Sequence, residues 1–254
     1  RLSGTDARHL VEFAGQSNIE QYFEIARHNS GFADSFWRYV RADKDVAVLT
    51  ALGGEGSRVY PAFSCMGSVT GRIFATKPRL QELRRSYRSV LGADEGKTLT
   101  YLDYAQFEPG ILASMADEEA LRHQYDAADL YAALSGAVFG SSDQRDLCKR
   151  LFLAYCFGMG TDNLAKLLSG GDFSPERLVH FRDSIAVFFS EFPGLESFRR
   201  LQQERLMREG YVSSLLGNRR LRQERGPLSA KESRWAMNHV VQSTASLIFK
   251  KALL

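Results

Sequence analysis

The chain has 254 residues, of which 44% are hydrophobic and 25% charged, and its 33 basic and 30 acidic side chains give a net charge of +3. These values are typical of a globular protein with one large or two small domains. No segment approaches the roughly eighteen consecutive apolar residues of a membrane-spanning helix. The composition therefore excludes an integral membrane protein of that kind, and no contact with a membrane is expected.

The ends and the cysteines of the chain indicate its cellular setting. The sequence begins RLSGTDARHL, with neither Met nor an apolar signal segment, and it ends abruptly at KKALL. We therefore expect no secretory signal peptide and interpret the chain as a fragment of a longer protein. Cys65, Cys148 and Cys156 form no CxxC pair. We interpret them as reduced structural thiols of an intracellular protein.

The predicted elements are mostly helical. Apolar residues at intervals of three and four predict helices within residues 10–42, and SRVYPAFS is predicted to be extended. The Thr-, Tyr- and Leu-rich segment Lys97–Tyr104 is the strongest predicted strand. Further helices are predicted at residues 109–116, 128–139, 144–157, 163–168, 175–192, 195–209 and 229–254. A β-hairpin with Gly217-Asn218 at its turn is predicted between the last two helices. The fold class is therefore α+β, with a small antiparallel sheet.

One row of side chains on the predicted helix 144–157 has the order of parts of a nucleotide. Arg145, Lys149, Leu153 and Phe157 follow one another at four-residue steps, and each step rotates by about 40° around the helix. The row presents two cations, an aliphatic side chain and an aromatic ring, as a triphosphate, a sugar and a base would require. The alternative is that the cations are solvated and the apolar pair is core, which spacing alone favours because such stripes are common.

Two other features indicate phosphate chemistry. Arg72–Arg88 contains six basic residues against one acidic residue, and Arg199–Arg234 contains ten against four. Such surpluses are able to follow a nucleic-acid backbone, although a solvated helix face explains each of them equally well. Asp103 ends the predicted strand and Glu108 follows five residues later. A carboxylate at a strand end is a natural ligand for Mg²⁺ beside substrate phosphates.

Six segments, taken together and in this order, resemble the polymerase domain of family A DNA polymerases from about Val59 to Leu254. TGR with a following PRLQ resembles the primer-template contact segment, and LDYAQFE resembles motif A. RDLCKRLFLAYCFGMG resembles motif B, the O helix. FFSEFP, GYVSSLLGNRR and VVQSTA resemble later landmarks. The resemblance implies a right-hand fold, with a thumb-like region at 1–58, a palm segment at 59–108, fingers at 109–210 and a return to the palm and fingers at 211–254.

The resemblance also implies the roles of individual residues. The expected reaction is template-directed addition of deoxynucleotides to a primer 3′ end, with two Mg²⁺ ions. The catalytic residues implied are Asp103, Arg145 and Lys149, and the metal ligands are the Asp103 carboxylate and the Tyr104 carbonyl. Glu108 is implied to be the gate that crowds the sugar 2′ position. The nucleotide-binding residues implied are Tyr104, Gln106, Glu108, Tyr131, Arg145, Lys149, Leu153 and Phe157, and the DNA-binding residues are Arg72, Gln81, Gly158, Arg219 and Gln242.

The chain departs from the family pattern at several positions. Leu153 replaces an aromatic residue that packs on the sugar, Phe157 replaces Tyr, and Pro109-Gly110 stand where Leu and Arg are common. The His-Asp-Glu motif C, which carries the second metal-binding aspartate, does not follow the VVQSTA helix. We expect it beyond Leu254 in a longer protein, and the fragment alone lacks the usual two-carboxylate site.

The departures leave alternatives open. These are a single-subunit RNA polymerase, against which Glu108 speaks, and a catalytically inactive polymerase-like protein that binds nucleic acid. Primer-template DNA and deoxynucleoside triphosphates are the expected partners, with additional domains or replication factors left open. The expected location is the cytoplasm, or the host cytoplasm if a phage or plasmid encodes the protein, and an organelle is not excluded.

Overall fold

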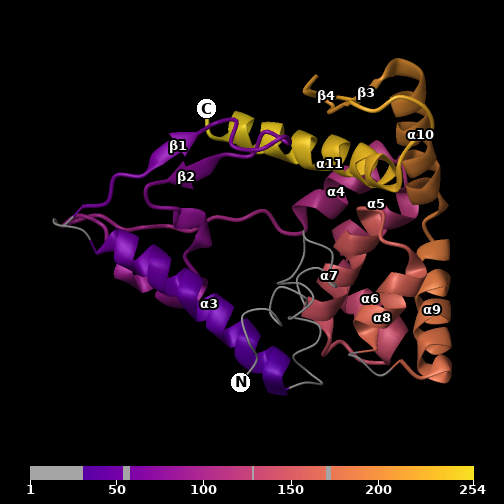
Figure 1. The fold of residues 1–254 in the computed structure, drawn as a ribbon, viewed down its shortest axis with the longest axis horizontal. Coiled ribbons are helices and arrows are strands. Elements are labelled where there is room, and N and C mark those ends of the chain that lie inside the picture. The colour runs from indigo at the N-terminus through magenta and orange to yellow at the C-terminus, as the bar shows by residue number, and fades with distance from the viewer. Residues whose placement is uncertain (1–30, 54–57, 128, 170–172) are drawn as a thin grey trace. The chain divides into compact units, whose positions relative to one another are not determined.

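The computed structural model describes residues 31–53, 58–127, 129–169 and 173–254 (Figure 1). The helices predicted within residues 10–28 lie outside these ranges. The described chain forms two compact units. The first contains Ala75–Leu91 and the described parts of Arg1–Ala62 and Ser169–Ser174, and the second contains Phe63–Phe74, Gly92–Leu168 and Pro175–Leu254.

The first unit is built around one long helix. Helix α3 (Gly31–Leu52) confirms the helix predicted from FADSFWRYVRA, and it contacts the short 3₁₀ helix η1 (Leu80–Glu82). A second 3₁₀ helix, η2 (Arg85–Val90), follows. Val48 and Leu83 are buried, and Arg84 forms an ion pair with Asp45 at 2.5 Å. The strands β1 (Ala62–Ser64) and β2 (Phe74–Thr76), which pair with each other in a two-stranded sheet, each have residues in both units.

The second unit contains the other described helices and the predicted hairpin. Its helices are α4 (Phe107–Met115), α5 (Glu119–Ala127), α6 (Leu130–Phe139), α7 (Arg145–Cys156), α8 (Thr161–Leu168), α9 (Pro175–Ser190), α10 (Pro193–Glu209) and α11 (Ala230–Ala252). Strands β3 (Tyr211–Ser213) and β4 (Arg219–Leu221) pair antiparallel, with Val212 opposite Arg220. The hairpin is therefore confirmed, and the described chain is mostly helical with a small antiparallel component, as predicted.

Local sequence signals explain where several of these helices begin and end. Asp129 caps α6 by accepting hydrogen bonds from the Tyr131 and Ala132 amides at 3.0 and 3.2 Å. Ser229 and Glu232 form a capping box at the start of α11. Helix α10 begins at Pro193 and ends before Gly210, which has φ = 74°. Proline at the first helical position and glycine just past the last one are the usual signals of such boundaries.

The core of the second unit lies between the helices. Leu121, Leu134, Phe152, Leu164, Ile185 and Leu195 are fully buried members of one hydrophobic cluster. Helix α7 contributes Cys148, Leu151, Phe152 and Cys156 to it. Removing apolar area of this kind from water is the main favourable term in folding. The buried face of α7 therefore fixes the orientation of its opposite, more exposed face.

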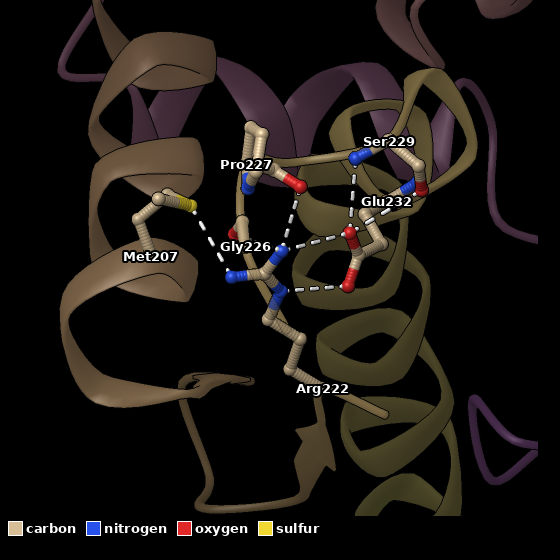
Figure 2. A network of polar contacts seen from close by, with 6 residues as sticks. All are labelled: Met207, Arg222, Gly226, Pro227, Ser229 and Glu232. Atoms are coloured by element: carbon tan, nitrogen blue, oxygen red, sulfur yellow. Dashed lines mark hydrogen bonds and ion pairs between the residues drawn. The ribbon is translucent and has the colours of Figure 1, made fainter. Parts of the chain in front are cut away.

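A polar network fastens the segment after β4 to the start of α11 (Figure 2). The Arg222 guanidinium donates to both carboxylate oxygens of Glu232, at 2.8 and 3.2 Å, and to the carbonyls of Gly226 and Pro227 at 2.7 and 2.9 Å. Both side chains of the ion pair are nearly buried, at 10% and 4% exposure. The hydrogen bond from Arg222 lowers the pKa of Glu232. The network therefore keeps Glu232 charged and holds the hairpin beside α10 and α11.

One predicted element is wrong. Lys97–Tyr104 forms no strand and has no regular secondary structure. Its apolar side chains are exposed, with Leu102 at 91%. Strand propensity describes how well a residue fits a paired, half-buried surface, so it forms a strand only where a neighbouring strand completes the ladder. Within the described residues, no other segment pairs with this one.

No helix among the described residues combines the length and the apolar character needed to cross a membrane.

Candidate active site

A cavity of about 610 Å³ in the second unit gathers five of the predicted site residues. Arg72, Asp103, Tyr104, Glu108 and Gln242 line it, and they come from the segment after β1, the irregular segment before α4, helix α4 itself and helix α11. Apolar side chains supply the rest of the wall, among them Phe107, Ala245 and Phe249. Residues as distant in the sequence as Arg72 and Gln242, which are 170 positions apart, therefore line one concave surface.

Arg72 and Glu108 are paired directly across this cavity. The Arg72 Nη2 atom lies 2.8 Å from Glu108 Oε1, and the two side chains are 49% and 20% exposed. Burial raises the pKa of Glu108, while the charges of Arg72 and Lys149 oppose that rise. The carboxylate predicted to be the sugar gate is thus held by the cation predicted to contact the primer terminus.

The oxygen donors predicted to bind metal lie on the same cavity. Asp103 and Tyr104 are exposed members of the irregular segment before α4. Among the described residues, no group of three or more His, Cys, Asp or Glu side chains is placed to hold a metal ion. The donors fit Mg²⁺ in kind, because this ion binds through one or two carboxylates together with water and substrate phosphates. They do not by themselves form a complete protein cage.

The start of α6 links the carboxylate-bearing turn to α7. Gln106 Oε1 accepts a hydrogen bond from the Leu130 amide at 3.1 Å. Asp129, the neighbouring cap residue, accepts a hydrogen bond from Arg145 Nε at 2.6 Å through its second oxygen. The first amides of a helix have no partner within the helix, so they are natural attachment points. The turn before α4 and the arginine at the start of α7 are therefore both fastened to the first residues of α6.

Arg145, Lys149 and Leu153 lie on the less buried face of α7, and Phe157 is the cap residue directly after the end of the helix at Cys156. Arg145, Leu153 and Phe157 are half-buried and Lys149 is exposed, whereas Cys148 and Phe152 between them are buried. Arg145 also lies over the Tyr131 ring, with its guanidinium carbon 5.5 Å from the ring centroid. Tyr131 itself is only 2% exposed, and burial raises the pKa of its hydroxyl. Phe157 packs partly against the core, and none of the four residues lines the cavity described above. The nucleotide-binding interpretation of the row stays a prediction.

The other residues predicted to contact DNA are dispersed. Gly158 follows α7 with φ = 89°, and a Cβ atom there would lie 3.1 Å from Arg234 Cγ of α11. Arg219 lies on β4, over the Tyr211 ring at 4.5 Å. Gln81 belongs to the first unit, where its Oε1 accepts a hydrogen bond from the Ala75 amide at 3.0 Å. The structure does not bring these three residues into the cavity.

Two residues that contact the predicted site residues or line the cavity were not identified from the sequence. Asp129 holds Arg145, and Ser246 lines the cavity while donating a hydrogen bond to the Gly71 carbonyl at 2.6 Å. Asp129, directly before the first helical residue Leu130, is a residue type typical of helix N-caps, and this is the signal that could have identified it. No local pattern identifies Ser246, because its partner lies 175 residues away.

Comparison with known proteins places the chain in a family. Residues 3–254 match the profile of DNA polymerase family A. DNA polymerase I of Chloroflexus aurantiacus is 28% identical over 213 residues, which cover 78% of this chain and 22% of that protein. DNA polymerase I of Aquifex aeolicus is 27% identical over 212 residues, which cover 79% of this chain and 35% of that protein. The chain therefore spans between about a fifth and a third of these curated relatives.

A solved structure shows the same fold. The POL domain of Pol1 from M. smegmatis, in complex with DNA primer-template and dNTP, matches 94% of this chain and 45% of that chain, with a TM-score of 0.72 and 23% identity. This likeness confirms the predicted polymerase-type α+β fold. Because the family profile extends over nearly the whole sequence, the protein belongs to DNA polymerase family A.

Proposed function

We propose that the full-length protein is a template-directed DNA polymerase that adds deoxynucleotides to a primer 3′ end. The primer hydroxyl attacks the α-phosphorus of the incoming triphosphate, the bond to the β,γ portion breaks, and pyrophosphate leaves. The observation that carries this proposal is the cavity that gathers Arg72, Asp103, Tyr104, Glu108 and Gln242 in a chain that belongs to DNA polymerase family A.

The cations of α7 have the chemistry to bind the triphosphate. Arg145 donates from Nε to Asp129, and its Nη1 atom lies 3.6 Å from the exposed Asp146 carboxylate. The terminal nitrogens would bind phosphate oxygens in exchange for that loose surface pair. Lys149 adds a compact, exposed charge one turn further along α7. Charge placed in advance where the leaving pyrophosphate becomes more negative is usually a large contribution to catalysis. Leu153 and Phe157 would then face the sugar and the base.

The residues of the cavity would hold the primer end and the reacting atoms. Arg72 and Gln242 are suited to contact minor-groove acceptors, which all correct base pairs share. Glu108, held by Arg72, would crowd the sugar 2′ position and favour deoxyribose. The Asp103 carboxylate and the Tyr104 carbonyl would be ligands of the divalent ions, two of which are expected. When bound, such ions stabilise negative charge on the phosphate oxygens and lower the pKa of the attacking hydroxyl.

Primer extension by the full-length protein tests the proposal. We expect Asp103→Ala to reduce extension by at least about 1,000-fold, because a metal-binding carboxylate contributes several kcal/mol of charge stabilisation in the transition state. Primer-template affinity should change little, since Asp103 is a single exposed side chain. Asp183→Ala, which removes an exposed carboxylate on α9, is the matched control and should extend as the wild type does.

Three outcomes would contradict the proposal. Near-wild-type extension by Asp103→Ala would refute the metal-binding role. Preference for ribonucleoside triphosphates on the same primed template would identify an RNA polymerase instead. Tight primer-template binding with no extension by the wild-type full-length protein would identify a binding protein on a polymerase scaffold.

A further inference from the structure

The turn that carries Asp103 and Tyr104 has a second attachment, on α5. The Tyr125 hydroxyl donates a hydrogen bond to the Ala105 carbonyl at 3.2 Å. Ala105 is the residue directly after Tyr104, and it precedes Gln106, whose side chain is bound by the Leu130 amide. The turn is therefore held from outside at two consecutive residues, once by α5 and once by α6.

The backbone of this turn needs such support. Gln106 adopts the left-handed conformation, with φ = 47° and ψ = 38°, which costs energy for any residue other than glycine. Residues 97–104 have no regular secondary structure and are exposed. Within the described residues no strand pairing fixes this segment, although the Tyr104 ring stacks on Phe107 with centroids 4.2 Å apart. The hydrogen bonds to Ala105 and Gln106 add a constraint on the backbone that this ring contact does not supply.

Gly110 makes the Tyr125 contact sterically possible. A Cβ atom at Gly110 would lie 2.8 Å from Tyr125 Cζ, 2.9 Å from Cε2 and 3.1 Å from the hydroxyl, closer than packed atoms approach one another. Glycine inside a helix is less favourable than alanine, so its presence within α4 calls for a local reason. The Tyr125 ring, packed against the first turns of α4 where its hydroxyl reaches Ala105, provides that reason.

We propose that Tyr125 is a positioning residue for the metal-binding turn, and that Gly110 acts by making room for it. The hydroxyl fixes the carbonyl of Ala105 and thereby the path of the adjoining peptide that presents the Tyr104 carbonyl and the Asp103 carboxylate. This inference rests on the proposed function, because it gives those oxygens their metal-binding role. It extends that role to a side chain on α5 that does not line the cavity.

The test measures metal binding and folding separately in the full-length protein. Mn²⁺ affinity is measured by the electron paramagnetic resonance of free Mn²⁺, with a dideoxy-terminated primer-template and a deoxynucleoside triphosphate present. Tyr125→Phe, which removes only the hydroxyl, is expected to weaken Mn²⁺ binding by roughly three- to tenfold, the effect of one hydrogen bond. Its melting temperature should stay near that of the wild type. Tyr60→Phe, at an exposed tyrosine of the first unit, is the matched control and should change neither quantity.

Gly110→Ala provides a second, independent variant. Its added methyl group should displace the Tyr125 ring and weaken Mn²⁺ binding by a similar factor. If Gly110 acts through the hydroxyl, the double variant Gly110→Ala/Tyr125→Phe should bind Mn²⁺ about as well as either single variant, because neighbours that share one interaction are not additive. Full additivity of the two effects would count against the inference.

Asp103→Ala separates this inference from the proposed function. Loss of Mn²⁺ binding in Asp103→Ala together with unchanged binding in Tyr125→Phe would overturn the positioning role alone. Unchanged binding in Asp103→Ala would overturn the metal site and, with it, the role of Tyr125. Weaker binding in Tyr125→Phe that is matched by a large fall in melting temperature would also overturn the inference, since it would indicate a general structural role.

Discussion

Two regions that the sequence predicts to be the cationic side and the carboxylate side of one site are built by different means. The cationic side lies on α7, a regular helix whose opposite face is fully buried through Cys148, Leu151 and Phe152. The carboxylate side lies on an exposed segment without regular secondary structure. It is held by the hydrogen bonds of Gln106 and Tyr125, the Arg72–Glu108 ion pair and the stacking of Tyr104 on Phe107. Packing of a whole helix face therefore fixes the first side, and a few polar contacts with one ring stack fix the second.

This contrast assigns different vulnerabilities to the two sides. A well-packed helix face transmits any change in core volume to the residues opposite, because protein interiors are close-packed. An exposed turn has little packing to lose, but each of its few hydrogen bonds fixes the direction of a ligand atom. We therefore expect core substitutions to act on the cationic side through large losses of stability, and single polar substitutions to act on the carboxylate side with only small changes in stability.

The largest expected effect is on the core beneath α7. Phe152 is fully buried and meets the rings of Tyr131 and Phe189 at centroid distances of 6.1 and 5.6 Å. Phe152→Ala should lower the free energy of unfolding by roughly 3–5 kcal/mol, because it leaves a cavity in a close-packed interior. Chemical denaturation measures this loss.

On the carboxylate side, Leu102→Ala removes a side chain that is 91% exposed, and it should change the free energy of unfolding by no more than about 0.5 kcal/mol. Equal losses in the free energy of unfolding for Phe152→Ala and Leu102→Ala would contradict the difference between the two sides.

The next effect concerns the exposed cation of α7. Lys149→Ala should reduce kcat/KM for single-nucleotide incorporation by roughly 100- to 1,000-fold, as the loss of one preorganised charge-stabilising donor does. Its melting temperature should be unchanged, because the side chain is exposed. Lys166→Ala, which removes another exposed lysine on the neighbouring α8, is the control. An unchanged kcat/KM in Lys149→Ala would contradict the proposal that Lys149 binds the triphosphate.

The smallest effect sharpens the comparison on the carboxylate side. Because burial raises the pKa of Glu108 above its ordinary value of 4.5, the folded protein holds this proton more tightly than the unfolded chain does. Protonated Glu108 therefore contributes fully to the free energy of unfolding below about pH 4.5. This contribution is lost as the pH rises through the pKa of Glu108 in the folded protein. Melting curves between pH 4 and pH 7 should show the wild type losing stability relative to Glu108→Gln. A difference that stays constant with pH, or one that runs the other way, would show that Glu108 is not desolvated.

Much of the site was predictable because its signals are local. The spacing of Arg145, Lys149, Leu153 and Phe157 predicts a partly exposed row on one helix. Helix α7 carries the first three on its less buried face, and Phe157 follows as its cap residue. The helix starts at Pro175 and Ser229 and the hairpin turn at Gly217 follow from residues within a few positions. The resemblance to family A polymerases was confirmed, whereas the roles of individual residues and the four-part division into thumb, palm and fingers stay predictions.

Only the tertiary structure decided what depends on distant partners. Lys97–Tyr104 has the composition of a strand, yet it forms none because no described segment completes its ladder. The Arg72–Glu108 pair and the contact of Tyr125 with Gly110 join residues 36 and 15 positions apart. Sequence periodicity determines which face of a helix is apolar, because neighbours one turn apart share that face. It does not determine which distant side chain meets a given turn, since packing and backbone hydrogen bonding of the whole unit settle that.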